Sequence, residues 1–578
     1  QMVETGDYIL IRYQDELRNK KPAGIHWLQA GSVAALSEPG AGEIWPYRVP
    51  SWIGVSLATV TAFWAGLALI GRPAAFLGAL MFGSTLLLTS EAHISKTDGV
   101  LVFLTTLGMA ALARLYVQQD NDRRLALLFW VAMGLGFLIK GPVTPLVAGL
   151  AMGGLYLWDG RRADWMRSLV WWPGPALFVL LVLPWFLWVQ IASSGEYLEG
   201  AVGKDLRDKL VSASEGHGGP PGYHLLHMPA LLFPATLFLI PAIYFTWQGV
   251  RRTALDVVAG VHKPGLKFLL AWGVPTWLFF EFLPTKLSHY ILPAYPAIGL
   301  LCGYGAFRLL SGMRAPVLRM ASAGLFALGG AALLAVFSPW VLPLLQAEAL
   351  SDFQTADPQT VAAQWAGAAA KPLWLWGLGA GAVVAATLAM ALRRLMPALL
   401  LGLVAAVAIG WHARIVTLPG QTWLHPTEQA REALIAACAL PKPHAAPEGC
   451  GPQPDHVQAV GYSEPSYVFR LGTANLHPPE TVVALPDTEA GYPAGFVINL
   501  EHPSGPLALE TLQEAAREAE RCLSRSAPRY ALNYSNGDPV SFVGVRIEAA
   551  PCGEALAGPA GLPVDDPGTQ PGTWAAIR

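Results

Sequence analysis

The feature that most constrains the fold is a succession of twelve apolar segments, each close to the roughly 20 residues that cross a bilayer as a helix. With 53% hydrophobic and only 13% charged residues among 578, the chain is too apolar for an ordinary soluble protein of this size. The sequence therefore predicts a polytopic α-helical membrane protein. The segments lie near residues 48–71, 74–92, 98–117, 124–140, 142–158, 169–191, 224–248, 267–283, 288–310, 318–344, 373–392 and 396–417.

Lysine and arginine are distributed unevenly between the loops on the two sides of these segments. By the positive-inside rule, the cation-rich loops are predicted to be cytoplasmic. Strict alternation then places residues 1–47 and 418–578 on the periplasmic side. No signal peptide is visible, so we expect a transmembrane helix before Gln1 to export residues 1–47, which gives thirteen spans. The cation-rich loops contain Arg72, Arg114, Arg123, Arg124, Arg161, Arg162, Arg167, Arg251, Arg252, Lys263, Lys267, Arg314, Arg319, Arg393 and Arg394.

Three regions follow from this pattern. Residues 1–47 are predicted to be amphipathic juxtamembrane helices, and residues 48–417 form the twelve-span transmembrane domain. Residues 418–578 are polar and are predicted to form a separate α/β domain. Its strands are expected in HVQAVGY, TVVALP, GFVINL and VSFVGVRI, and an amphipathic helix in LALETLQEAAREAERCLSR. NYSNGDPVSF indicates a hairpin turn, which we favour over glycosylation of Asn533.

Four of the five cysteines fall in residues 418–578, which indicates two disulfides in an oxidising compartment. Pairing of neighbours closes the shortest loops and predicts Cys438–Cys450 and Cys522–Cys552. Other pairings, or four unrelated thiols, are the alternatives. Cys302 lies in an apolar segment and is predicted to be a buried free thiol.

Polar residues gather in the predicted periplasmic loops. Lysine and arginine there can bind phosphate oxygens by charge-assisted hydrogen bonds. Asp98, facing water beside cations, would stay ionised and could orient a sugar hydroxyl or accept its proton. The candidates for substrate binding are Arg18, Lys20, Lys21, His26, Lys96, Lys140, His217, Tyr223, Lys286, His289 and Tyr290, with Asp98 as the catalytic candidate.

Structural roles compete with each of these assignments. The lysines can be interfacial side chains that extend to the lipid headgroups. Asp98 can be a helix N-cap, and Gly141-Pro142 can be a simple helix start. His217 can be inert, or can bind zinc with His26 or His93, although the spacing does not decide this. No P-loop or dinucleotide-binding motif is present, and the net charge of −2 argues against a nucleic-acid partner.

Four motifs, KPAGIHWLQA, KTDGVL, LIKGP and KLSHYILPAYPA, resemble in this order the lipid-linked glycosyltransferases of family 83, the aminoarabinose transferase type. These enzymes are related to protein O-mannosyltransferases. The resemblance implies a GT-C fold with thirteen spans and a C-terminal periplasmic α/β domain. It also implies that Lys21 lies near the donor phosphate and that His217 matches a metal-holding loop histidine. Lys20 stands where the family has a glutamate, so we predict no metal; the family's main catalytic aspartate is expected before Gln1.

The resemblance implies an inverting glycosyltransferase of the bacterial inner membrane, with its active site on the periplasmic side. The enzyme would move a sugar from a polyprenyl-phosphate carrier to a lipid A, lipopolysaccharide-type or other periplasmic acceptor. We expect a monomer surrounded by membrane lipids, with no cofactor. The alternatives are a protein O-glycosyltransferase and a lipid-linked sugar flippase or transporter. A transporter is expected to show inverted repeats and helices broken at the midplane, and no repeat is visible.

Overall fold

The computed structural model describes residues 1–18, 20–38, 42–118, 121–161, 164–206, 218–251, 263–312, 315–338, 340–341, 353, 359–361, 373–445, 448–473, 476–477, 493–533 and 537–551. The chain divides into two compact units. The helical domain comprises Gln1–Arg12, Glu16–Val341 and Pro372–Val416, and the α/β domain comprises Tyr13–Asp15, Leu342–Lys371 and Thr417–Arg578.

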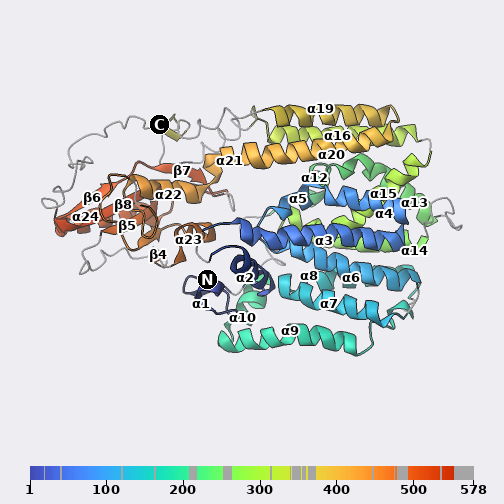
Figure 1. Ribbon diagram of the computed structural model, residues 1–578, viewed down its shortest axis with the longest axis horizontal. Helices are drawn as coiled ribbons and strands as arrows, with labels where there is room; N and C mark the ends of the chain where they lie inside the picture. Colours follow the sequence, from blue (N-terminus) through green and yellow to red (C-terminus); the bar gives the residue numbers. More distant parts are fainter. Residues whose placement is uncertain are drawn as a thin grey trace. The chain divides into compact units, whose positions relative to one another are not determined.

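Every apolar segment predicted from the sequence contains a helix of the helical domain (Figure 1). The elements are α1 (Met2–Thr5), α2 (Gly24–Leu36), α3 (Trp45–Leu69), α4 (Arg72–Gly83), α5 (Leu86–Ala92), α6 (Asp98–Gln118), α7 (Arg123–Lys140), α8 (Val143–Trp158), η1 (Asp164–Met166), α9 (Pro173–Ala192), α10 (Glu196–Leu198), η2 (Glu199–Leu206), α12 (Tyr223–Leu231), η4 (Ala235–Phe238), α13 (Leu239–Arg251), α14 (Lys263–Phe282), η5 (Ser288–Ala294), α15 (Tyr295–Leu310), α16 (Pro316–Val336), α19 (Trp374–Ala391), α20 (Leu395–Trp411) and η7 (His412–Thr417). Two short strands, β1 (Arg12–Tyr13) and β2 (Glu16–Leu17), pair near the start of the chain.

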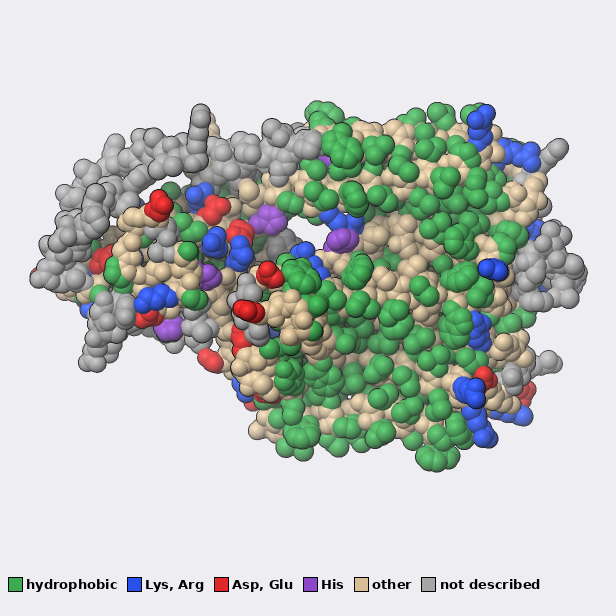
Figure 2. All heavy atoms as spheres, viewed as in Figure 1, with side chains coloured by type: hydrophobic (Ala, Val, Ile, Leu, Met, Phe, Trp, Pro, Cys, Tyr) green, Lys and Arg blue, Asp and Glu red, His purple; other side chains and the backbone are tan. Residues whose placement is uncertain are grey.

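Seven helices in the described part of the chain are long and apolar enough to cross a membrane, and the number is nine when each of two bent pairs is one span. The chain is thus a multi-pass membrane protein. The remaining predicted segments correspond to α7, α8 and α14, so the number of twelve spans stays a prediction. Apolar side chains cover the flank of the helical domain, and Lys and Arg side chains gather at one of its ends (Figure 2).

The bent pairs shape the end of the domain that contains Asp98. Helices α4 and α5 meet at 59°, and α12 meets the segment Ala235–Arg251 at 102°. The first residue of α5 is held by a hydrogen bond from the Leu86 amide to the Phe233 carbonyl, 2.9 Å long. Helix α5 also packs against α6, α12 and η5. These short elements end the apolar bundle and bring polar loops together.

The α/β domain contains a six-stranded sheet of order β4-β3-β5-β8-β6, in which β7 also pairs with β8. Strand β3 is parallel to β4 and β5, whereas β8 is antiparallel to β5, β6 and β7. The elements are α21 (Leu418–Gly420), η8 (Thr422–Leu424), α22 (Pro426–Ala436), β3 (Val457–Val460), α23 (Pro465–Leu471), β4 (Leu476–His477), β5 (Ala494–Asn499), α24 (Ser504–Glu518), β6 (Arg521–Arg525), β7 (Arg529–Leu532) and β8 (Pro539–Pro551).

Alternate residues of the central strands face two separate cores. Val497 and Phe542 pack with Leu434 of α22, whereas Ile498 and Val543 pack with Leu512 of α24. Both faces of the sheet are therefore covered, which explains why every residue of β5 is buried rather than every second one.

The predicted strands HVQAVGY, GFVINL and VSFVGVRI are confirmed as β3, β5 and β8, whereas TVVALP lies outside the described residues. The predicted helix ends at Glu518, and its last residues form β6, because Cys522 and Leu523 pack into the sheet instead of continuing the helical face. The hairpin is confirmed by the pairing of Leu532 with Pro539.

Cys438 and Cys450 form a disulfide in the α/β domain, the pair predicted from their spacing. Cys302 is a buried free thiol, also as predicted. Cys522 is disulfide-bonded, but Cys552 lies outside the described part of the chain, so the second pairing stays a prediction.

Candidate active site

Asp98 is fixed at the start of α6 by close packing of α6 on α3. A Cβ placed on Gly99 would lie 2.7 Å from the Ser51 carbonyl oxygen, so only glycine permits this approach. The Ser51 hydroxyl also donates to the Lys96 carbonyl over 3.0 Å. The segment Lys96-Thr97-Asp98-Gly99 is therefore held against α3, and Asp98 is 3% exposed.

The Asp98 carboxylate is surrounded by side chains from three other parts of the helical domain. The Lys140 Nζ donates to Asp98 Oδ1 at 2.7 Å. Lys96 Nζ lies 3.9 Å from Asp98 Oδ2 and 2.9 Å from Glu91 Oε1. His289 Nε2 lies 3.9 Å from Asp98 Oδ2. We call Glu91, Lys96, Asp98, Lys140, His289 and Tyr290 the Asp98 cluster.

Lys140 is the last residue of α7, and the following turn sets the direction of its side chain. Gly141 has φ +58°, a conformation that strongly favours glycine, and its amide donates to the Phe137 carbonyl at 2.8 Å. The Lys140 ammonium lies 5.4 Å from the centre of the Tyr290 ring, within range of a cation–π interaction. The LIKGP motif thus places the Lys140 ammonium next to the Asp98 carboxylate.

The N-cap interpretation of Asp98 is not supported by these contacts. Helix α6 begins at Asp98 itself, and the Asp98 side chain contacts Lys140, Lys96, His289 and the Thr97 hydroxyl. Asp98 is 42 residues from Lys140 in sequence, so this contact exists only in the tertiary structure.

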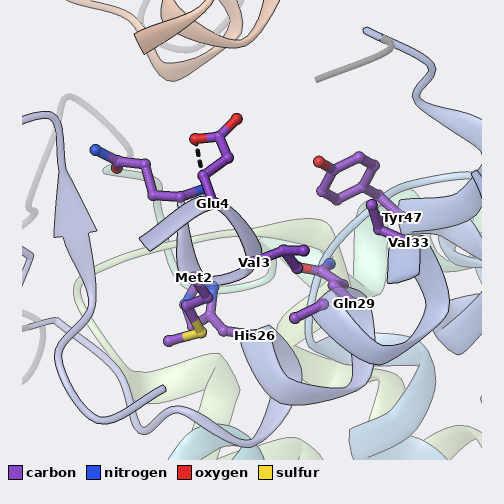
Figure 3. Close-up of a pocket in the computed structure, with 9 residues that line it drawn as sticks. Met2, Val3, Glu4, His26, Gln29, Val33 and Tyr47 are labelled. Carbon is purple, nitrogen blue, oxygen red and sulfur yellow. Dashed lines mark ion pairs between the residues drawn. The ribbon is translucent and has the colours of Figure 1, made fainter. Parts of the chain in front are cut away.

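The N-terminal cations lie just before α2. Arg18, Lys20 and Lys21 are exposed, and Lys21 precedes α2 by a few residues. His26, in the first turn of α2, lines a cavity of about 110 Å³ with Met2, Glu4 and Tyr47 (Figure 3). Burial, with a smaller contribution from the positive charges of Lys21 and Arg18, lowers the pKa of His26 to about 4. His26 is therefore a neutral ring near pH 7.

Lys286, predicted from the sequence to contact the donor phosphate, is almost fully buried. It is 5% exposed, and its ammonium donates to the Glu281 carbonyl oxygen. The Glu281 carboxylate accepts from the Gly222 amide at 2.9 Å and lies 3.4 Å from His224 Nδ1. Lys286 therefore belongs to a buried connection between the end of α14 and the start of α12.

The other loop candidates have separate positions. The Tyr223 hydroxyl lies 3.5 Å from the Ser288 hydroxyl, one residue before His289. His217 lies outside the described residues. Within the described part of the chain, no group of three or more His, Cys, Asp or Glu side chains could hold a metal ion.

Two charged side chains were absent from the candidates chosen from the sequence. Glu91 is 3% exposed, and its Oε2 has no hydrogen-bond partner among the described residues, so a substrate hydroxyl could donate to it. Arg414, in the turn η7 after α20, donates to the Thr89 and Ser90 hydroxyls of α5. The sequence offered one signal for each: Glu91 stands two residues before His93, and Arg414 is a charge near the end of a long apolar segment.

Part of the chain is similar to known proteins. Residues 20–188, which include Lys21, Asp98 and Lys140, match the family model of dolichyl-phosphate-mannose-protein mannosyltransferase. Undecaprenyl phosphate-α-4-amino-4-deoxy-L-arabinose arabinosyl transferase 2 of Pseudomonas fluorescens is 25% identical over 308 residues, which is 53% of each chain. The corresponding transferase of Pseudomonas paraeruginosa is 27% identical over 335 residues, 57% of each chain. The matches thus span about half the length of these curated relatives.

The fold comparison covers nearly the whole chain. The crystal structure of ArnT from Cupriavidus metallidurans bound to undecaprenyl phosphate superposes with a TM-score of 0.64 at 19% identity, over 97% of this chain and 93% of ArnT. The apo form of the same protein gives 0.60 at 18% identity. The chain therefore has the GT-C fold with a C-terminal α/β domain, and it is similar to the aminoarabinose transferase type of lipid-linked glycosyltransferase, as its motifs predicted.

Proposed function

We propose that the protein is an inverting glycosyltransferase that takes a sugar from a polyprenyl-phosphate carrier. The Asp98 cluster is the observation on which this rests, because it gathers two carboxylates and two lysines at one end of the helical domain. The similarity to ArnT, solved with undecaprenyl phosphate bound, supports a lipid phosphate as the ligand of such an end.

In the proposed reaction, an acceptor oxygen attacks the anomeric carbon while the bond from that carbon to the phosphate oxygen breaks. The departing phosphate gains negative charge, which nearby ammonium groups stabilise in the transition state. Lys140 and Lys96 can turn spare N–H groups toward that phosphate while they remain close to Asp98. Asp98 and Glu91 then orient sugar or acceptor hydroxyl groups, and a carboxylate receives the proton of an acceptor hydroxyl.

The lysine-rich segment of residues 18–21 is assigned to the same donor. Lys21 precedes a proline, as in the family motif, and its exposed side chain can reach a phosphate at the membrane surface. His289 and Tyr290 form the wall beside Lys140, and Tyr223 contributes a hydroxyl next to Ser288. Lys286 is assigned a supporting role, because its ammonium is buried against the Glu281 carbonyl.

Lipid A or a related lipopolysaccharide component is the proposed acceptor, since the curated relatives are aminoarabinose transferases. The distribution of cations between the loops supports a periplasmic orientation of the Asp98 end in the bacterial inner membrane. A protein acceptor is the second candidate, because the matching family model is that of protein mannosyltransferases.

The test uses purified protein in detergent with undecaprenyl-phosphate sugars, beginning with 4-amino-4-deoxy-L-arabinose, and lipid A as the acceptor. Mass spectrometry should detect released undecaprenyl phosphate and lipid A heavier by one sugar. Transfer of the sugar to a peptide, and not to lipid A, would support the protein-acceptor hypothesis. Movement of intact donor across vesicles, without release of undecaprenyl phosphate from any donor, would instead establish a transporter.

A further inference from the structure

Arg414 connects the turn η7, which follows α20, to α5, the helix that also contains Glu91. Its Nη2 donates to the Thr89 hydroxyl at 3.0 Å and to the Ser90 hydroxyl at 3.1 Å. The Thr89 hydroxyl donates in turn to the Thr85 carbonyl over 3.0 Å, so it is fixed as an acceptor for the guanidinium. Arg414 is thereby held at the same short helix as the Asp98 cluster.

The backbone presents Arg414 in an unusual way. Helix α20 changes at its end into the π-helical turn η7, and such turns are frequent at functional sites. The preceding His412 is buried and contacts the Phe337 carbonyl at 3.2 Å, which anchors the turn beyond the end of α16.

Within the described part of the chain, Arg414 has no ion pair with a carboxylate. Its two hydrogen-bond partners are neutral hydroxyl groups, and both contacts use Nη2. A guanidinium has five N–H donors, so those on Nε and Nη1 remain for another acceptor. Arg414 is only partly buried.

The Asp98 cluster, by contrast, is balanced in charge. Counting Glu91 and Asp98 as carboxylates and Lys96 and Lys140 as ammonium groups, the formal charges cancel, and each lysine is paired with an acid. Lys96 and Lys140 can donate to an anionic phosphate that enters this end of the domain, but their charges are already balanced by Glu91 and Asp98, so the phosphate charge calls for a further cation. Arg414 offers it, with the planar geometry that suits two phosphate oxygens.

On the basis of the proposed transferase function, we propose that Arg414 binds a phosphate of the lipid substrate, beside the Asp98 cluster. The phosphate can be that of the polyprenyl donor or one on a phosphorylated lipid acceptor, because the same chemistry recognises both. Thr89 and Ser90 act as positioning residues that hold the guanidinium toward the ligand.

The experiment measures binding of two probes, undecaprenyl phosphate and bis-phosphorylated lipid A, to purified full-length protein in detergent. Loss of a charge-assisted hydrogen bond to a phosphate predicts that R414Q weakens the Kd for at least one probe roughly tenfold to 150-fold. Weaker binding of undecaprenyl phosphate identifies the donor phosphate, and weaker binding of lipid A alone identifies the acceptor phosphate. The matched control is R48Q, because Arg48 is an exposed arginine at the start of α3.

Two further variants keep the test decisive if R414Q does not fold. R414K keeps the charge but loses the planar fork, so it should weaken the same probe by a smaller factor. The double variant Thr89→Val with Ser90→Ala keeps the arginine and removes its support, with the same expectation. Folded variants that bind both probes as wild type does would overturn the role of Arg414 alone. Failure of the wild-type protein to bind either probe would instead contradict the proposed function.

Discussion

Replacing Asp98 by Asn removes one negative charge with almost no change in shape, and it should abolish most of the sugar transfer. An N-cap function would survive, because asparagine caps a helix as well as aspartate does. A carboxylate that orients or deprotonates a substrate would not survive. The substitution therefore separates the structural role of Asp98 from the chemical one.

The size of the effect follows from the contacts of Asp98. The Asp98 side chain is 4% exposed and that of Lys140 is 17% exposed, with 2.7 Å between Nζ and Oδ1. Removing one partner of a buried ion pair costs about 3–5 kcal/mol. Because Lys140 keeps partial access to water, we expect the lower end, about 3 kcal/mol of unfolding free energy. Transfer should fall by at least the roughly tenfold to 150-fold that one charge-assisted hydrogen bond represents.

A matched control separates lost chemistry from lost stability. Asp159 forms a similar pair, 2.6 Å from Lys267 and 2.7 Å from the Tyr116 hydroxyl, with 21% exposure of its side chain. It follows α8, whereas Lys140 precedes that helix, so the two pairs are about 24 Å apart along 16 residues. Asp159→Asn should therefore destabilise the protein comparably while its kcat at a permissive temperature stays near that of wild type.

The assay compares thermal unfolding, followed by the fluorescence of the 21 tryptophans, with the initial rate of undecaprenyl phosphate release. The double variant Asp98→Asn with Lys140→Gln leaves no uncompensated charge at the pair, so it should regain stability without regaining transfer. Wild-type turnover by Asp98→Asn at a temperature where it is folded would refute the assignment of Asp98 to the active site.

Four further outcomes are expected. Gly141→Ala should lower the free energy of unfolding by about 1–3 kcal/mol and slow transfer, because φ +58° is strained for alanine and the turn orients Lys140. The control Gly149→Ala lies inside α8 with open space around it and should do neither. Equal melting curves for the two variants would argue against the strain. The His26 pKa of about 4 lies below its ordinary 6.5, so the unfolded chain binds the proton more readily than the folded chain does. The contribution of His26 to stability should therefore be full above pH 6.5 and fall toward pH 4 by at most about 3 kcal/mol. His26→Gln should flatten that part of the plot of melting temperature against pH. A reporter fused after Arg578 should be active only in the periplasm, and cytoplasmic reporter activity would reverse the orientation. Non-reducing peptide mapping should find Cys522 joined to Cys552, and another partner for Cys522 would correct the pairing.

The sequence by itself determined the fold class and most of the element positions. Apolar segments of bilayer length predict membrane helices without reference to any partner, because a backbone in hydrocarbon must satisfy its own hydrogen bonds. The strand β5 and the hairpin before β8 were likewise predictable, since apolar composition and turn residues act locally. The conversion of Arg521–Arg525 from helix to strand was not, because pairing with β8 outweighed the helical pattern.

The candidate site was predictable in composition but not in arrangement. KTDGVL, LIKGP and KLSHYILP indicated that Lys96, Asp98, Lys140 and His289 belong to the loops of one side. Only the tertiary structure decided that Lys140 pairs with Asp98, while Lys286 is buried against Glu281. The sequence could not distinguish these two lysines, because both follow long apolar helices.

Arg414 shows the same limit most clearly. In the sequence it is one charge at the end of an apolar segment, as expected of any interfacial arginine. Its contacts with Thr89 and Ser90 join residues more than 300 positions apart, and they exist only because the turn η7, which follows α20, brings Arg414 to α5. Hydrophobicity is a property of each segment and can be read along the chain. The pairing of charges depends on which helix ends meet, and packing across the whole bundle decides that.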